Sequence, residues 1–325
     1  IARLAEQEQA LLADLDAKSA PGALATRARE LGMVQDSTPA FIDRLTRLLD
    51  RIEPLLPTAR ETDFEAAVAF RWRRLRSALG SQGVLQPVPR ISSIGLSDLR
   101  NVDDQKETIA QNTRQFVLGH PANNVLLTGA RGTGKSSLIK ACLNEYAERG
   151  LRLIEVDKAD LVDLPDIVDL VADRKERFIV YCDDLSFDEG EPGYKALKSI
   201  LDGSVAQASD NVLIYATSNR RHLLPEYMKD NLSYKHLENG EVHPGEVVEE
   251  KISLSERFGL WVSFYPFSQD EYLAIVAQWL RNFGVADDAV EAARQESLVW
   301  ALERGSRSGR VAYQFARDYA GRHHS

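Results

Sequence analysis

At 325 residues, the chain is long enough to form two or three domains around sizeable cores. Its composition, 44% hydrophobic and 27% charged, is typical of a soluble globular protein, with no apolar run of membrane-spanning length and no signal-peptide pattern. The net charge of −9 argues against a surface that coats DNA, and two cysteines are too few for a disulfide or metal framework. We therefore expect a cytoplasmic protein. Because the sequence begins at Ile1 rather than Met, we also expect its true N-terminus to be missing.

The first 90 residues (1–90) predict a helical domain and a linker. Apolar residues recur at helical spacing, Ser37-Thr38-Pro39 is typical of an N-cap and first turn, and a last helix is expected from about Glu61 to Gly80. No strand is expected here. Four arginines on the last helix suggest contact with nucleic acid, but we favour a solvated helix face, because two of them must point away from any single contact surface: Arg71, Arg73, Arg74 and Arg76.

Residues 91–267 predict an α/β nucleotide-binding domain. Apolar runs typical of buried strands alternate with helical patterns, which indicates a five-stranded parallel sheet with helices on both faces. A polar stretch from about 225 to 255 is expected to be a functional lid or a mobile segment. Residues 268–325 predict a small C-terminal helical lid domain. The five runs expected as strands cover residues 124–128, 151–156, 178–184, 211–217 and 260–265.

The sequence from Gly129 to Ser136 fits the phosphate-binding P-loop pattern G-x-x-x-x-G-K-[ST] (Walker A), and it lies between an apolar run and a helical pattern, as this motif requires. Glycines let the backbone bring its N–H groups onto phosphate oxygens, Lys135 can reach the β- and γ-phosphates, and the Ser136 hydroxyl can bind Mg²⁺. We therefore expect ATP and Mg²⁺ as cofactors. The residues expected to contact the nucleotide are Gly129, Ala130, Arg131, Gly132, Thr133, Gly134, Lys135, Ser136 and Ser137.

Two carboxylates, Asp183 and Asp184, end the third apolar run. Because ligands of parallel sheets bind at the carboxyl ends of the strands, we expect Asp183 opposite Ser136, holding Mg²⁺ directly or through water as in a Walker B motif. Asp184 is then the candidate for orienting the attacking water. An acid at a strand end is a weak signal by itself, since caps and turns also use Asp.

Together these motifs resemble those of AAA+ ATPases. The chain is more closely similar to a bacterial AAA+ family known only under a domain-of-unknown-function label, and more distantly similar to replication-initiator and helicase-loader ATPases. The resemblance spans about residues 70–320. It is carried by the P-loop and by residues 121–127, 183–187, 218–220 and 254–260.

The resemblance implies roles for three further polar residues. Asn219 matches sensor 1 beside the γ-phosphate, Arg257 matches the arginine finger that completes a neighbouring subunit's site, and Arg310 matches sensor 2 on the lid. A surface salt bridge is the alternative for each. The family usually carries Glu where this chain has Asp184. Hydrolysis is therefore expected to be slow, or to wait for a partner that closes the site.

These expectations favour an Mg²⁺-dependent ATPase that couples ATP binding and hydrolysis to a macromolecular client, with a homo-oligomer forming through Arg257. One alternative is a slowly hydrolysing switch or adaptor that engages a protein through the helices of residues 1–90. A DNA-associated loader is a further alternative, which the acidic net charge disfavours. A metabolic kinase would leave the sensor-like residues unexplained. No membrane partner is expected.

Overall fold

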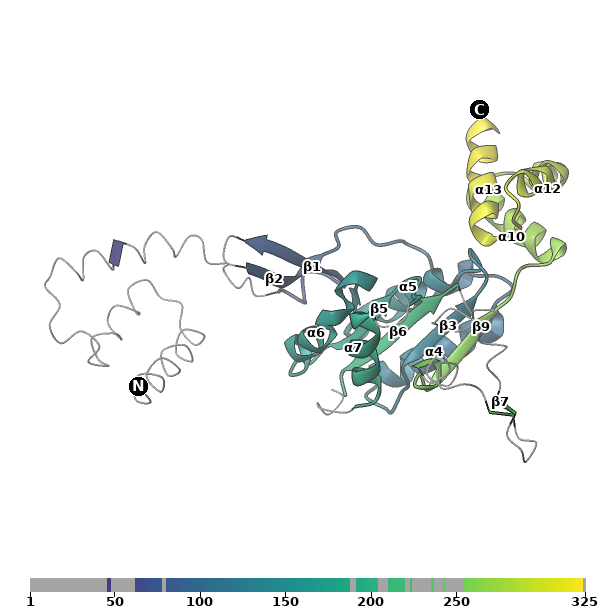
Figure 1. Cartoon of the computed structure of the whole chain (residues 1–325). Helices are drawn as coiled ribbons and strands as arrows, with labels where there is room; N and C mark the ends of the chain where they lie inside the picture. Colours follow the sequence, from purple (N-terminus) through teal and green to yellow (C-terminus); the bar gives the residue numbers. More distant parts are fainter. Residues whose placement is uncertain are drawn as a thin grey trace, which may run out of the picture. The chain divides into compact units, whose positions relative to one another are not determined.

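The computed structural model describes residues 46–47, 62–77, 80–187, 191–203, 210–219, 223, 235–236, 242–243 and 254–323. The chain divides into two compact units, Ile1–Glu61 with Arg74–Gln82, and Thr62–Arg73 with Gly83–Ser325. The second unit holds most of a seven-stranded sheet, the helices on its faces and a C-terminal group of helices (Figure 1). All of the functional residues discussed below belong to this unit.

The strands of the sheet lie in the order β2-β1-β4-β5-β6-β3-β9, and every neighbouring pair from β1 to β9 is parallel. All five strands expected from the apolar runs are present, which confirms the predicted α/β P-loop fold, with two strands more than predicted. The strand bounds are β1 (Ala69–Ser77), β2 (Gly80–Pro87), β3 (Val125–Gly129), β4 (Leu151–Glu155), β5 (Arg177–Cys182), β6 (Val212–Ser218) and β9 (Leu260–Phe264).

The two additional strands, β1 and β2, occur where we expected a helix and no strand, so that prediction was wrong. Phe70 and Trp72 of β1 are buried, whereas Arg71 and Arg73 beside them are only partly buried. This alternation has the period of two that a half-buried strand requires. The apolar spacing also suited a helix, but pairing with β4 places Phe70 opposite Ile154 in the core, and only the extended conformation allows this.

Two of the arginines considered for nucleic-acid contact have acidic partners within the chain. Arg71 Nη2 lies 2.6 Å from Glu155 Oε2, and Arg73 Nη1 lies 3.0 Å from Asp157 Oδ2. Both acids lie at the carboxyl end of β4 or just beyond it. These arginines therefore stabilise the junction of β1 and β4.

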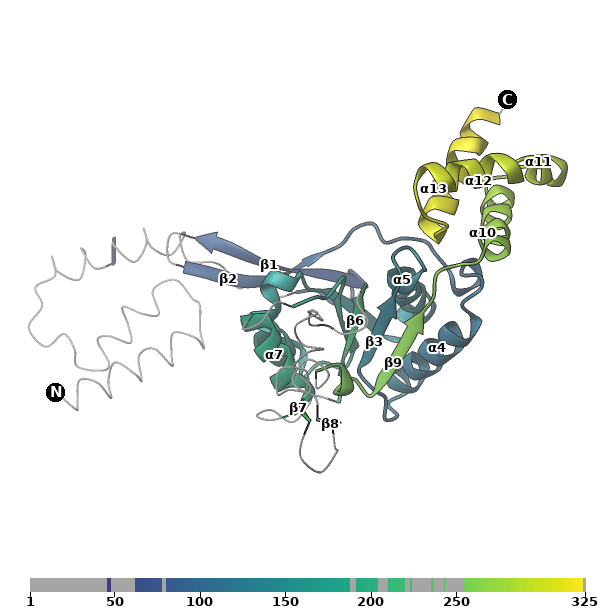
Figure 2. The ribbon, with the colours of Figure 1, turned by 45° about the vertical axis from the view of Figure 1, so that its right-hand side comes forward.

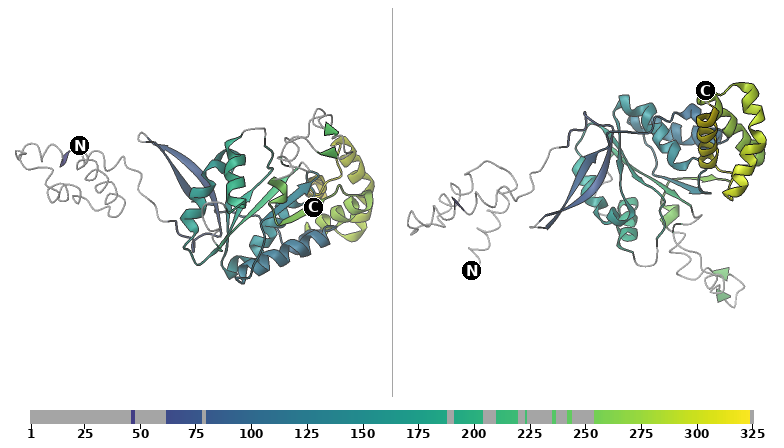
Figure 3. Two further views of the ribbon diagram at one scale, coloured as in Figure 1. Left: turned by 60° about the horizontal axis from the view of Figure 1, so that its bottom comes forward. Right: turned by 90° about the horizontal axis from the view of Figure 1, so that it is seen from above.

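Helices cover both faces of the sheet (Figure 3). On one face α4 and α5 share a core with Leu127 and Tyr215, and on the other α6 and α7 share a core with Leu126 and Ile214. Successive strand residues thus enter opposite cores, which explains why these runs are apolar throughout. The bounds are α4 (Asp103–Val117), α5 (Lys135–Tyr146), α6 (Leu164–Val171), α7 (Pro192–Leu201), and the short 3-10 helices η2 (Leu96–Asp98), η3 (Ala147–Arg149) and η4 (Lys158–Asp163).

Between β9 and residue 323, four helices form a C-terminal group (Figure 2), and their buried residues belong to the same core as those of α4 and α5. The first of them begins with a capping box, in which Ser268 Oγ accepts from the Glu271 N–H and Glu271 Oε2 accepts from the Ser268 N–H. None of the described helices combines the length and the apolar composition needed to cross a membrane. The bounds are α10 (Gln269–Asn282), α11 (Asp287–Ala292), α12 (Arg294–Glu303) and α13 (Gly309–His323).

Several expectations lie outside the described residues. These are the helices expected before residue 61 and most of the polar stretch from 225 to 255. Within that stretch a two-residue antiparallel pair is described, β7 (Lys235–His236) with β8 (Val242–His243). The sheet already begins before residue 91, where we placed the start of the nucleotide-binding domain, and the boundary at 267 stays a prediction.

Candidate functional site

The P-loop leaves β3 and turns back into α5 through glycines in a conformation that other residues rarely adopt. Gly129, Gly132 and Gly134 have φ values of 121°, 72° and 100°. A Cβ at Gly129 would lie 1.9 Å from the carbonyl oxygen of Phe264 on β9, so the strand beside it leaves no space for a side chain. A glycine loop of this kind, ending at a helix N-terminus, gathers N–H groups for an anion.

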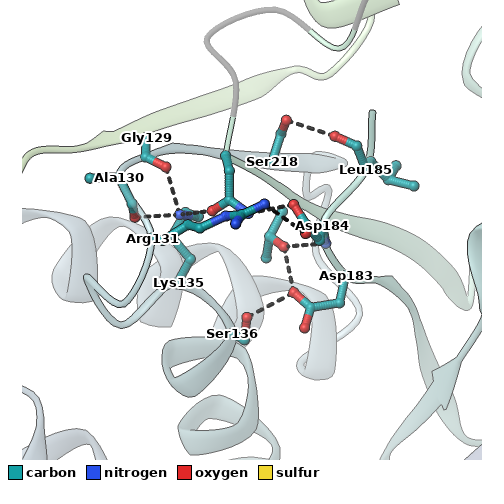
Figure 4. Close-up of polar contacts among 11 residues, drawn as sticks. Gly129, Ala130, Arg131, Lys135, Ser136, Asp183, Asp184, Leu185 and Ser218 are labelled. Atoms are coloured by element: carbon teal, nitrogen blue, oxygen red, sulfur yellow. Dashed lines mark hydrogen bonds and ion pairs between the residues drawn. The ribbon is translucent and has the colours of Figure 1, made fainter. Parts of the chain in front are cut away.

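Lys135 is buried at the start of α5, and its ammonium group closes the loop (Figure 4). Nζ donates hydrogen bonds to the carbonyl oxygens of Gly129 and Ala130, each at 2.7 Å, and to Asn219 Oδ1 at 3.1 Å. Burial lowers the pKa of Lys135, and the carboxylates of Asp183 and its neighbour oppose this effect. The lysine is thereby held at the carboxyl ends of β3 and β6.

Ser136 and Asp183 meet across the site. Ser136 Oγ donates to Asp183 Oδ1 at 2.8 Å, and Thr217 Oγ1 donates to the same oxygen at 2.6 Å. Burial raises the pKa of Asp183, but these two hydrogen bonds and the nearby Tyr181 hydroxyl outweigh it and hold that pKa below its ordinary value. A hydroxyl and an ionised carboxylate side by side are the oxygen ligands that Mg²⁺ prefers. Sequence reasoning did not assign a role to Thr217, which it placed only at the end of a strand.

Asp184 has a left-handed backbone with a φ of 52°. Its N–H donates to Thr217 Oγ1 at 2.9 Å, and its carboxylate accepts a hydrogen bond from Asn219 Nδ2. Arg131 of the P-loop lies 3.9 Å from the same carboxylate. Asn219 therefore contacts Asp184 with its amide nitrogen and Lys135 with its amide oxygen. This one side chain links the acid to the P-loop.

These side chains surround a cavity of about 750 Å³. Besides the P-loop and the two acids, the cavity is lined by a segment preceding α4 and by the C-terminal helices. The segment preceding α4 was not predicted as a wall of the site, whereas the C-terminal helices were expected as a lid that carries Arg310. The lining residues outside the P-loop and the acids include Ile94, Asp98, Leu99, Val102, Thr217, Asn219, Phe267, Ile275, Trp279, Arg310 and Tyr313.

The C-terminal helices rest directly on the P-loop. The Gly309 N–H at the start of α13 donates to the Gly132 carbonyl at 2.8 Å. A Cβ built at Gly132 would lie 2.8 Å from both Cβ and Oγ of Ser308, and 3.5 Å from Cβ of Arg310. Arg310 thus lies beside the P-loop and lines the cavity.

Arg257 does not line this cavity. It follows a helical turn before β9, and its Nε forms an ion pair with Asp202 at the end of α7. The structure therefore brings together Lys135, the two acids, Asn219 and Arg310, but it separates Arg257 from them. A position away from its own subunit's cavity is what an arginine finger acting on a neighbouring subunit would need.

A protein family described as "Protein of unknown function (DUF815)" matches residues 65–323. Among curated proteins, nothing matches the chain.

Similar solved structures include a RuvB mutant from Thermotoga maritima, with 14% identity and a TM-score of 0.46 over 69% of this chain and 63% of that chain. A chain of the HORMA:CdnC:Trip13 complex from E. coli MS115-1 has 13% identity and a TM-score of 0.44 over 69% and 90%. A DNA replication initiation factor has 16% identity and a TM-score of 0.42 over 71% and 64%. The chain thus spans less than two thirds of the RuvB and initiation-factor chains that it matches.

Proposed function

This chain belongs to the DUF815 family of proteins of unknown function, and from this premise we propose that it is an Mg²⁺-dependent ATPase of the AAA+ type. One observation carries the proposal. The P-loop lysine, the hydroxyl–carboxylate pair of Ser136 and Asp183, and the acid Asp184 all face one cavity at the carboxyl ends of parallel strands. Sites at this edge of a sheet are where α/β proteins bind their ligands.

The residues present fit Mg²⁺-ATP. The cavity of about 750 Å³ is large enough for a nucleotide, since small-molecule sites span about 300–1,000 Å³. Its polar end carries Lys135, Arg131 and Arg310, which offset phosphate charge, and its other walls carry apolar side chains such as Trp279 that suit a base. Ser136 and Asp183 supply two adjacent oxygens for the metal. Bound Mg²⁺ would neutralise charge on the transferred phosphoryl group.

We assign the remaining roles from the contacts of each side chain. Lys135 would exchange its hydrogen bonds with the loop carbonyls for the phosphates, and Asp184 would accept a hydrogen bond from the attacking water. Asn219 would hold Asp184 in place, because its amide group already contacts both Asp184 and Lys135. Arg310 would place a positive charge from the lid beside the P-loop.

Lys135→Ala tests this proposal. It removes the only lysine that lines the described cavity, so we expect Mg²⁺-dependent phosphate release to fall by a factor on the order of 10²–10³. Lys175→Ala is the matched control, because this exposed lysine pairs with Glu65 and does not line the cavity. Steady-state phosphate release that survives Lys135→Ala at the rate of the control would refute the assignment.

A slowly hydrolysing nucleotide switch is the second candidate, and the surroundings of Asp184 favour it. The acid is one methylene shorter than glutamate, and its carboxylate already accepts a hydrogen bond from Asn219. If reach to the water limits turnover, Asp184→Glu should raise the single-turnover rate and Asp184→Asn should lower it. Equal rates for wild type and Asp184→Glu would mean that the length of this acid does not limit hydrolysis.

We further propose that Arg257 acts on the site of a neighbouring copy, so that the ATPase is a homo-oligomer working on a macromolecular client. Arg257→Ala and Lys135→Ala should each be inactive alone. An equal mixture should recover activity, because some interfaces then pair an intact P-loop with an intact Arg257. Recovery without any increase in solution mass on addition of Mg²⁺-ATP would contradict assembly that depends on the nucleotide. Absence of recovery would contradict action on a neighbour.

A further inference from the structure

Two buried tyrosines lie side by side on the sheet below the candidate metal site. Tyr181 of β5 and Tyr215 of β6 are register partners, and both belong to the core shared with α5. Tyr181 precedes Asp183 by two residues, and α5 begins with the turn that carries Ser136. The pair therefore differs mainly in what each hydroxyl contacts.

The Tyr215 hydroxyl is satisfied and the Tyr181 hydroxyl is not. Tyr215 accepts a hydrogen bond from Asn112 Nδ2 at 3.0 Å and shares another with Thr113 Oγ1 at 2.9 Å. Within the described part of the chain, the Tyr181 hydroxyl has no hydrogen-bond partner, although the side chain is only 1% exposed. A buried polar group without a partner in a native protein is unusual and calls for an explanation.

The surroundings of the Tyr181 hydroxyl indicate what its partner is. Burial raises the pKa of Tyr181, and the negative charge of Asp183 adds to that effect. The hydroxyl in turn helps to lower the pKa of Asp183. It therefore lies next to the carboxylate, on the side of the sheet from which Ser136 also approaches.

We propose that Tyr181 is a positioning residue of the divalent-cation site, whose hydroxyl donates a hydrogen bond to the Asp183 carboxylate when the cation–nucleotide complex is bound. This inference rests on the proposed function and adds a residue to its metal site. The Tyr181 hydroxyl already helps to lower the pKa of Asp183 without reaching hydrogen-bond geometry, and in the loaded site it donates a full bond to that carboxylate, beside the bonds from Ser136 and Thr217. Outer groups that orient metal ligands commonly change metal affinity by about 10–100-fold.

Tyr181→Phe and Tyr215→Phe form a matched pair for testing this. Each removes one hydroxyl from the same face of the same sheet. Tyr181→Phe should weaken Mn²⁺ binding to the protein–ATP complex by about tenfold, measured as free Mn²⁺ by electron paramagnetic resonance. In EDTA, it should leave ATP affinity by calorimetry and the urea midpoint of unfolding unchanged, or raise the midpoint. Tyr215→Phe should lower the urea midpoint, because Asn112 and Thr113 lose a partner, and should leave Mn²⁺ affinity unchanged.

The outcomes separate this inference from the proposed function. If wild type binds ATP and Mn²⁺, and Tyr181→Phe binds Mn²⁺ as tightly as wild type, the inference fails and the proposed function stands. If both variants lose Mn²⁺ affinity equally, the effect is structural and the inference fails again. If wild type binds no nucleotide in EDTA and no Mn²⁺ with ATP, the proposed function fails and the inference fails with it.

Discussion

The contact between the P-loop and the C-terminal helices makes Gly132→Ala the most informative single substitution. Gly132 has a φ of 72°, and the added Cβ would lie 2.8 Å from Cβ and Oγ of Ser308. The substitution therefore introduces two separable penalties. One is the strain of a left-handed residue with a side chain, and the other is the collision with Ser308.

The magnitudes follow from these two terms. A left-handed conformation costs about 1–2 kcal/mol for a residue with a Cβ. Overpacking in a close contact costs about 1–3 kcal/mol. We therefore expect Gly132→Ala to lower the free energy of unfolding by about 2–5 kcal/mol. Because the collision pushes the start of α13 away from the P-loop, nucleotide affinity should fall as well.

Two further variants isolate the terms. Gly305→Ala carries the strain alone, since Gly305 has a φ of 63° with nothing within 4 Å of a built Cβ, and it should cost only about 1–2 kcal/mol. Ser308→Gly removes the atoms that collide. It also removes the cap of α13, in which Ser308 Oγ accepts a hydrogen bond from the Val311 N–H at 3.3 Å, at a cost of roughly a few tenths of a kcal/mol. In the double variant, Ser308→Gly should therefore recover about 1–3 kcal/mol of the Gly132→Ala penalty.

Stability is measured by urea denaturation of the protein without nucleotide, and the unfolding midpoints are compared using one m-value for all variants. ATP affinity is measured separately by calorimetry. Wild type, Gly132→Ala, Ser308→Gly and the double variant form a double-mutant cycle, which gives the coupling energy between residues 132 and 308. Additivity to within about 0.5 kcal/mol would refute the reasoning, because the collision would then contribute nothing. A Gly132→Ala protein no less stable than Gly305→Ala would refute it equally.

Three further predictions concern stability. Asn211→Ala should lower the free energy of unfolding by about 2–3 kcal/mol in urea titrations, because the buried Asn211 side chain donates to the carbonyl oxygens of Val171, Arg174 and Glu176; a loss below about 0.5 kcal/mol would contradict this. Ser268→Ala should cost about 1 kcal/mol by the same measurement, since it removes the cap of α10; a cost equal to that of an exposed Ser→Ala control elsewhere would argue against the cap. Hydrogen bonds from the backbone and side chain of Ser268 lower the pKa of Glu271. The difference in unfolding free energy between wild type and Glu271→Gln should therefore be full above pH 4.5 and vanish as the pH falls through that lowered pKa. A difference that does not depend on pH would contradict this prediction.

The P-loop and the central sheet could be predicted from short stretches of the sequence. The glycines at 129, 132 and 134 and Lys135 lie within seven consecutive residues, and the positive φ values of the loop alone dictate the glycines. The same holds for the five apolar runs, since strands buried on both faces of a parallel sheet need no distant partner to look apolar. The predicted helix was wrong at residues 69–77, because the apolar residues there fit both a helical and a strand spacing. Only pairing with β4 decides between the two conformations.

Tertiary structure alone decided how the site is assembled. Thr217 gains its significance because β5 and β6, which are distant in sequence, lie next to each other and place its hydroxyl on Asp183. The contact of Gly132 with Gly309 joins residues from opposite ends of the nucleotide-binding unit, and no motif records it. Arg257 could be assigned by resemblance, yet its distance from its own cavity and its ion pair with Asp202 follow only from the fold. The physical reason is that backbone conformation depends on neighbours in sequence, whereas hydrogen bonds between side chains depend on which elements the core brings together.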